Sequence, residues 1–100
     1  MLNITKNANG NALKIILEGR LDTTTAPQLE AQLQDALGSV TDLKFDLEKL
    51  EYISSAGLRV LLASQKIMNK QGTMTVKNAS QEIKEIFEVT GFDELLNIEK

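Results

Sequence analysis

At positions 50–59 the chain reads LEYISSAGLR, in which the serine pair Ser54 and Ser55 stands between two apolar patterns. The preceding residues, 43–48, alternate strictly between apolar and polar side chains, which predicts a strand. The following residues carry apolar side chains at helical spacing, so a helix is expected over about 54–70. Serine is a favoured helix N-cap, and the pair is therefore expected at the junction between this strand and this helix.

The rest of the chain predicts a small two-layer α/β domain. The spacing of apolar residues assigns an opening hairpin with its turn at 7–11 and its second strand at 12–18, helices at 25–37 and about 80–90, and a strand at 73–77. This order contains two crossover connections between parallel strands, and a right-handed path for both places the helices mainly on one face. Because the strands alternate, the second face is expected to remain in water.

Local signals at the first helix and near the C-terminal end complete this assignment. Thr25 and Gln28 have the spacing of a capping box, in which each side chain bonds to the backbone of the other residue. Leu95, Leu96 and Ile98 follow the last helix and are expected to complete the hydrophobic core.

The composition fits one domain over residues 1–100, because 42% hydrophobic and 25% charged residues can bury a single core. The chain has no cysteine and no histidine, which removes disulfides, thiolate metal sites and the commonest catalytic base. We therefore expect no metal, no cofactor and no enzymatic activity, since a serine nucleophile would have no histidine to activate it.

Charge and hydropathy limit the classes of partner. The net charge is −3, the basic residues are dispersed and only four residues are aromatic, so nucleic acid is not an expected partner. Charged residues interrupt every apolar stretch well before bilayer length, and the N-terminus lacks the pattern of a secretory signal. These features predict a cytoplasmic domain without direct membrane insertion.

The serine pair and Asp22 are the candidate functional residues, and each also has a purely structural explanation. The backbone N–H groups and the positive dipole end of a helix start would stabilise a phosphate on Ser54 or Ser55. Gly57 lacks a β-carbon and would allow another chain to approach closely. Either serine can equally be an N-cap and nothing more. Asp22 is either a turn carboxylate or a partner contact.

Three segments resemble one known family. ISSAGLRVLL at 53–62 resembles the Asp-Ser-Ser/Thr-Gly-Leu helix start of anti-sigma-factor antagonists in the STAS superfamily. GRLDTTT at 19–25 matches the Gly-x-Leu-Asp-x-x-Thr segment that precedes the first helix of these proteins, and IFEVTGF at 86–92 is similar to their final helix and turn. The resemblance covers nearly the whole chain, and it implies a STAS-type domain with a mixed four- to five-stranded sheet.

The resemblance also implies a function and its residues. Alignment on Gly57 puts Ser55 at the family's phosphoserine, and Ser54 is the second choice for the modified residue. In this alignment Ser54 stands where the family has an aspartate, and Ala56 stands where it has a second hydroxyl residue. An anti-sigma factor that is also a serine kinase would bind the domain and release it on phosphorylation, and a serine phosphatase would reverse the modification. The implied partner surface consists of Asp22, Thr23, Ser54, Ser55, Ala56, Gly57 and Arg59.

Ser54 and Ala56 differ from the family pattern, and this difference leaves a second function open. A STAS subunit that is not phosphorylated could use the same helix start as a constitutive contact, docking on a membrane transporter or a lipid-transfer assembly. Incorporation of phosphate at Ser55 distinguishes the two functions.

Overall fold

The computed structural model describes residues 1–99 and has an α/β fold. Its elements, in chain order, are β1 (Leu2–Asn9), β2 (Ala12–Leu21), α1 (Ala26–Ala36), β3 (Asp42–Ile53), α2 (Ser55–Gln71), β4 (Thr73–Lys77), α3 (Gln81–Thr90) and α4 (Phe92–Leu95). The strands form one sheet in the order β1-β2-β3-β4, in which β1 is antiparallel to β2 and the other neighbours are parallel. The expected mixed sheet with crossover connections is confirmed.

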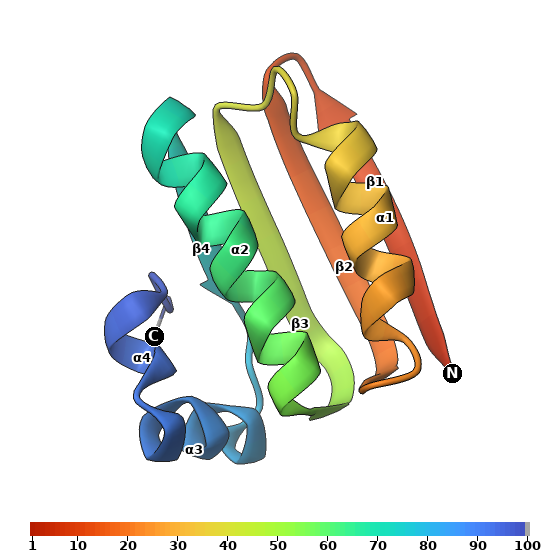
Figure 1. Cartoon of the computed structure of the whole chain (residues 1–100), viewed down its shortest axis with the longest axis vertical. Coiled ribbons are helices and arrows are strands. Elements are labelled where there is room, and N and C mark those ends of the chain that lie inside the picture. Colours follow the sequence, from red (N-terminus) through yellow and green to blue (C-terminus); the bar gives the residue numbers. More distant parts are fainter. Residues whose placement is uncertain (100) are drawn as a thin grey trace.

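The helices α1 and α2 lie side by side over one face of the sheet, and α3 lies across the end of the sheet at the bottom of Figure 1. The other face is polar. On it, Lys14 Nζ lies 3.6 Å from Asp46 Oδ2, and Lys44 Nζ lies 3.4 Å from Asp42 Oδ2. The expectation that one face stays in water is confirmed, because the alternating strands have only one apolar side.

Strands β2 and β3 are longer than the sequence pattern predicted, since they run past positions 18 and 48. The pairing register between them shifts twice, because β3 holds one extra residue at each of two bulges. The bulges change the spacing of buried residues in β3 from two to three, at Leu47, Leu50 and Ile53. Residues 49–53, which follow the strand predicted over 43–48, are therefore also part of β3.

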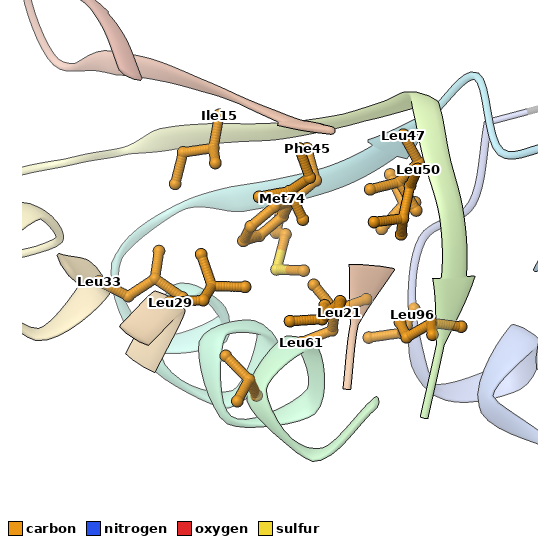
Figure 2. Close-up of a cluster of buried hydrophobic side chains, with 14 of the residues drawn as sticks. Ile15, Leu21, Leu29, Leu33, Phe45, Leu47, Leu50, Leu61, Met74 and Leu96 are labelled. Atoms are coloured by element: carbon orange, nitrogen blue, oxygen red, sulfur yellow. The ribbon is translucent and has the colours of Figure 1, made fainter. Parts of the chain in front are cut away.

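The hydrophobic core lies between the sheet and the helices. In Figure 2, Phe45 and Met74 of the sheet face Leu29 of α1 and Leu61 of α2. All four side chains are at most 1% exposed. Burial of a side chain of this size stabilises the fold by about 1.5–3 kcal/mol, so this layer fixes both helices, and with them their first residues, against the sheet.

The helix α2 buries two polar residues and leaves some apolar ones exposed. Ile67 is 44% exposed and Ala63 is exposed, whereas the polar residues Ser64 and Gln65 are buried. The Ser64 hydroxyl donates a hydrogen bond to the Val60 carbonyl at 3.0 Å, which allows a polar side chain to face the interior. Among residues 1–99, no helix has the length and apolar character that crossing a bilayer requires.

The C-terminal segment completes the core with fewer residues than expected. Leu96 is buried, but Leu95 is 53% exposed, so the prediction that Leu95 belongs to the core is wrong. Both residues lie at the end of α4, a four-residue helix in which only one side can face inward. Ile98 is half-buried and forms a single parallel bridge with Val76, which is all that the described residues contain of a fifth strand.

Candidate functional site

The carboxyl ends of β2 and β3 meet at the bottom of Figure 1, where α1 and α2 both begin. Leu21 pairs with Ile53 in parallel register, and the backbone N–H of Ser54 donates a hydrogen bond to the Leu21 carbonyl at 2.9 Å. Because parallel strands end at the same edge of a sheet, the loop after β2 and the serine pair after β3 are neighbours. The two sequence motifs that precede α1 and α2 thus form one region.

The two serines have different positions at the start of α2. Ser54 is the N-cap, with extended backbone, and its half-buried side chain accepts a hydrogen bond from the Gly57 N–H at 3.4 Å. Ser55 is the first helical residue and is exposed. Within residues 1–99 the Ser55 hydroxyl makes no hydrogen bond to another protein group. One serine therefore caps the helix, and the other presents an accessible hydroxyl.

The first turn of α2 also provides a suitable electrostatic environment for a negative charge. It contains no acidic residue. The N–H groups of a helix's first turn lack intrahelical acceptors, and together with the helix dipole they stabilise an anion there. Ser54 satisfies one of these groups, and the region around Ser55 retains this favourable field.

Gly57 is buried and packs against the core, so its role differs from the close approach of another chain that the sequence suggested. A β-carbon added at Gly57 would lie 2.7 Å from Leu21 Cγ and 2.9 Å from Ile53 Cγ1. The missing side chain therefore allows α2 to begin directly against the ends of β2 and β3. This contact positions the serine pair.

Asp22 holds the loop before α1 in shape. Its Oδ1 accepts hydrogen bonds from the Thr24 hydroxyl at 2.7 Å, the Thr24 N–H at 3.0 Å and the Thr25 N–H at 3.1 Å. The hydrogen bond from the Thr24 hydroxyl, with those from the two backbone N–H groups, outweighs desolvation and lowers the pKa of Asp22 below its ordinary value of 3.8. Asp22 is thus a charged turn residue at neutral pH.

The predicted capping box between Thr25 and Gln28 does not form. Thr25 is the N-cap of α1, but its side chain makes no capping hydrogen bond. Its hydroxyl instead donates to the Arg20 carbonyl at 2.9 Å and accepts from the Asp22 N–H at 2.8 Å. The Asp22 carboxylate accepts the N–H groups of Thr24 and Thr25 in the loop, and the Gln28 N–H donates to the Thr25 backbone carbonyl at 3.0 Å.

The structure brings Thr23, Ala56 and Arg59 together around a shallow hollow between the starts of α1 and α2. Glu30 of α1 lines the same hollow. Thr23 and Arg59 are exposed, and Ala56 is half-buried. All the residues expected at the partner surface therefore lie at the end of the domain where α1 and α2 begin, and Thr23, Ser55 and Arg59 are the exposed ones.

The sequence did not indicate Arg20 and Tyr52 as site residues. They are paired across β2 and β3, and the guanidinium carbon of Arg20 lies 4.5 Å from the centroid of the Tyr52 ring, a cation–π contact. Arg20 Nε also lies 3.8 Å from Asp22 Oδ2. Tyr52 is 38% exposed beside the serine pair, and its position two residues before Ser54 was the available signal.

Acidic side chains do not form a metal site in residues 1–99, where no group of three or more potential ligands comes together. Asp22 lies at the end of β2, whereas Asp46 lies on the open face of the sheet and pairs with Lys14. Asp46 also accepts hydrogen bonds from the Glu48 N–H and the Asn78 side chain. The carboxylates thus serve local structure.

Comparison with known proteins identifies the family. A family model described as "Mlab, STAS domain" matches residues 4–97, and this chain belongs to the STAS domain family. Among its curated relatives is the anti-sigma-B factor antagonist of Bacillus subtilis, which is 28% identical over 97% of this chain and 90% of that protein. A Bordetella bronchiseptica protein described as an anti-sigma factor antagonist, BtrV, is 33% identical over 91% of this chain and 80% of its own length.

Solved structures show the same fold. The phosphorylated form of the Bacillus cell fate determinant SpoIIAA superimposes with a TM-score of 0.75 at 20% identity, covering 100% of this chain and 92% of that one. The family and the fold expected from the three sequence segments are both confirmed.

Proposed function

We propose that this domain is an anti-sigma-factor antagonist that binds its anti-sigma factor through the start of α2 and is released when Ser55 is phosphorylated. The observation that carries the proposal is the separation of the two serines. Ser54 is used as the helix cap, whereas Ser55, the first residue of α2, is exposed. The names of the curated relatives support the same class of function.

In this proposal the anti-sigma factor is also the kinase. It transfers the γ-phosphoryl group of ATP to Ser55 Oγ, the hydroxyl proton is lost and ADP is released. The exposed position of Ser55 and the absence of acidic residues from the first turn of α2 favour the modification at this position. A serine phosphatase restores the unmodified domain. Because the anti-sigma factor, its ATP and the phosphatase act in the cytoplasm, the proposed switch operates there as well.

The size of the electrostatic change is sufficient for release. Phosphorylation adds about −1.5 to −2 charge, and burying a charge that is not fully compensated in an interface costs about 2–5 kcal/mol. At about 1.4 kcal/mol for each factor of ten, this cost weakens binding by about 30-fold to several thousand-fold.

The test is a binding measurement with three forms of the domain. Wild type and Ser55→Ala are expected to retain an anti-sigma factor from native lysate, identified by mass spectrometry, whereas Ser55→Asp is expected to retain much less. Equal retention of the anti-sigma factor by all three forms would contradict the switch. Retention of a membrane transporter or a lipid-transfer component by all three would support the second function, the constitutive docking that Ser54 and Ala56 leave open.

A further inference from the structure

Arg59 lies four residues after Ser55 on α2 and is exposed. Side chains four residues apart lie on the same side of a helix, and long side chains in helices point back toward the N-terminus. The length and direction of the Arg59 side chain therefore bring its guanidinium group within reach of the Ser55 hydroxyl.

Arg59 has no carboxylate partner in the part of the chain that the structure describes. The ion pairs found within 4.0 Å among residues 1–99 involve Lys14, Arg20 and Lys44. Glu30 lines the same hollow as Arg59, but its carboxylate oxygens lie more than 4.0 Å from the Arg59 guanidinium nitrogens. The guanidinium group is thus available both to a partner and to a new negative charge on this chain.

We infer that Arg59 binds the phosphate group of phosphorylated Ser55, and that this internal pair withdraws from the partner surface the cation that the unmodified domain presents. The inference rests on the proposed function and specifies its mechanism. An acidic residue four positions before a basic one is the favourable order on a helix, and a guanidinium group can bind phosphate through two parallel hydrogen bonds.

The consequence is a switch with two components in one helical turn. In the unmodified domain, Arg59 offers a positive charge to an acidic group of the anti-sigma factor. In the phosphorylated domain, Ser55 adds about −1.5 to −2 charge, and Arg59 is engaged by that phosphate. The modification therefore removes an attractive group from the interface while it adds a repulsive one.

The pair can be tested on a domain that carries phosphoserine at position 55 from translation, so that the result does not depend on a kinase. The second pKa of the phosphate is followed by phosphorus NMR during a pH titration. A neighbouring cation favours the dianion, so Arg59→Gln is expected to raise this pKa by about 0.2–0.4 units relative to wild type. Arg59→Lys should restore part of the difference, because it keeps the charge but loses the paired geometry.

The matched control is Lys66→Gln, which removes an exposed cation from α2 at a distance from Ser55. It is expected to leave the phosphate pKa unchanged, and thermal melting of each variant verifies that it folds. Equal pKa shifts in Arg59→Gln and Lys66→Gln would contradict the pair. The factor by which phosphorylation weakens binding to the anti-sigma factor should also be smaller in Arg59→Gln than in wild type, and an equal factor would contradict the role of Arg59 in release.

The two proposals fail in different ways. If native lysate and ATP place no phosphate on Ser55, the proposed phosphorylation is wrong even when the NMR titration shows the pair in the translated phosphoprotein. If Ser55 is phosphorylated but the titration is insensitive to Arg59, the switch stands and the Arg59 pair is wrong.

Discussion

The starts of α1 and α2 lie next to each other at the same end of the sheet, but they are built differently. Before α1, the Asp22 carboxylate accepts several hydrogen bonds from the loop, and the Thr25 hydroxyl bonds in turn to Arg20 and Asp22. Before α2, the Ser54 side chain accepts one long hydrogen bond, and Ser55 remains exposed.

This difference shows where to look for function in a small domain. The presence of a polar side chain that bonds to its own loop can be explained by its contribution to stability. The side chains of Asp22 and Thr25 are of this kind. An exposed hydroxyl that makes no hydrogen bond within the described chain, placed on a firmly packed helix, is accessible to a partner or a modification. The comparison accounts for the first helix start by its own hydrogen bonds, and it leaves Ser55 in the second as the residue proposed for modification.

The first prediction is that, beyond their first turns, the two helices contribute equally to the stability of the fold. Leu29 of α1 and Leu61 of α2 are both 0% exposed. Leu29→Ala and Leu61→Ala are each expected to lower the free energy of unfolding by about 2–5 kcal/mol in denaturant melts. Ile67→Ala, on the exposed side of α2, is the control and should cost much less. A loss below about 0.5 kcal/mol for Leu61→Ala would contradict its placement in the core.

The second prediction concerns the packing that supports the start of α2. Gly57→Ala is expected to cost about 1–3 kcal/mol, because its new β-carbon would overlap Leu21 and Ile53. Gly38 after α1 is the matched control, since a β-carbon there would meet no atom within 4 Å. Denaturant melts of Gly57→Ala and Gly38→Ala should therefore differ clearly, and equal stabilities would mean that α2 does not begin against the ends of the strands.

The third prediction tests the side-chain network before α1. Thr25→Val keeps the shape of the side chain but removes the hydroxyl that bonds to the Arg20 carbonyl and the Asp22 N–H. Loss of these bonds leaves a partly buried backbone carbonyl without its donor and is expected to cost about 1–3 kcal/mol by thermal or denaturant melting. A neutral result would show that the loop before α1 does not depend on its side chains.

The fourth prediction separates the two serines by stability. Ser54→Ala removes the N-cap of α2 and is expected to cost about 1 kcal/mol. Ser55→Ala changes an exposed residue and should stay within about 0.5 kcal/mol of wild type. A larger loss for Ser55→Ala than for Ser54→Ala would reverse the roles that the structure gives them.

The fold was largely predictable because its signals are local. Helical spacing located α1, α2 and α3, and alternation located β4, the opening hairpin and the first half of β3. The second half of β3 was missed because two bulges interrupt the alternation, the first between Asp46 and Lys49 and the second between Leu50 and Tyr52. Bulges arise from the pairing between β2 and β3, which the sequence of β3 alone does not contain.

The site was predictable to the extent that its residues follow one another in the chain. The junction after β3 placed Ser54 and Ser55 at the start of α2. The contact between Arg20 and Tyr52 was missed because it depends on the parallel register of two strands. The failure of the capping box could not be foreseen for a similar reason, since the turn geometry directs the Thr25 hydroxyl to the Arg20 carbonyl and the Asp22 N–H.

The most direct test of the central claim is site-resolved mass spectrometry of wild type, Ser54→Ala and Ser55→Ala after incubation with native lysate and ATP. We predict phosphate on Ser55 in wild type and in Ser54→Ala, and none on the serine pair in Ser55→Ala, while all three forms still bind the anti-sigma factor before ATP is added. Phosphate on Ser54, or on neither serine while the unmodified domain retains its partner, would contradict the account and favour constitutive docking through the same surface.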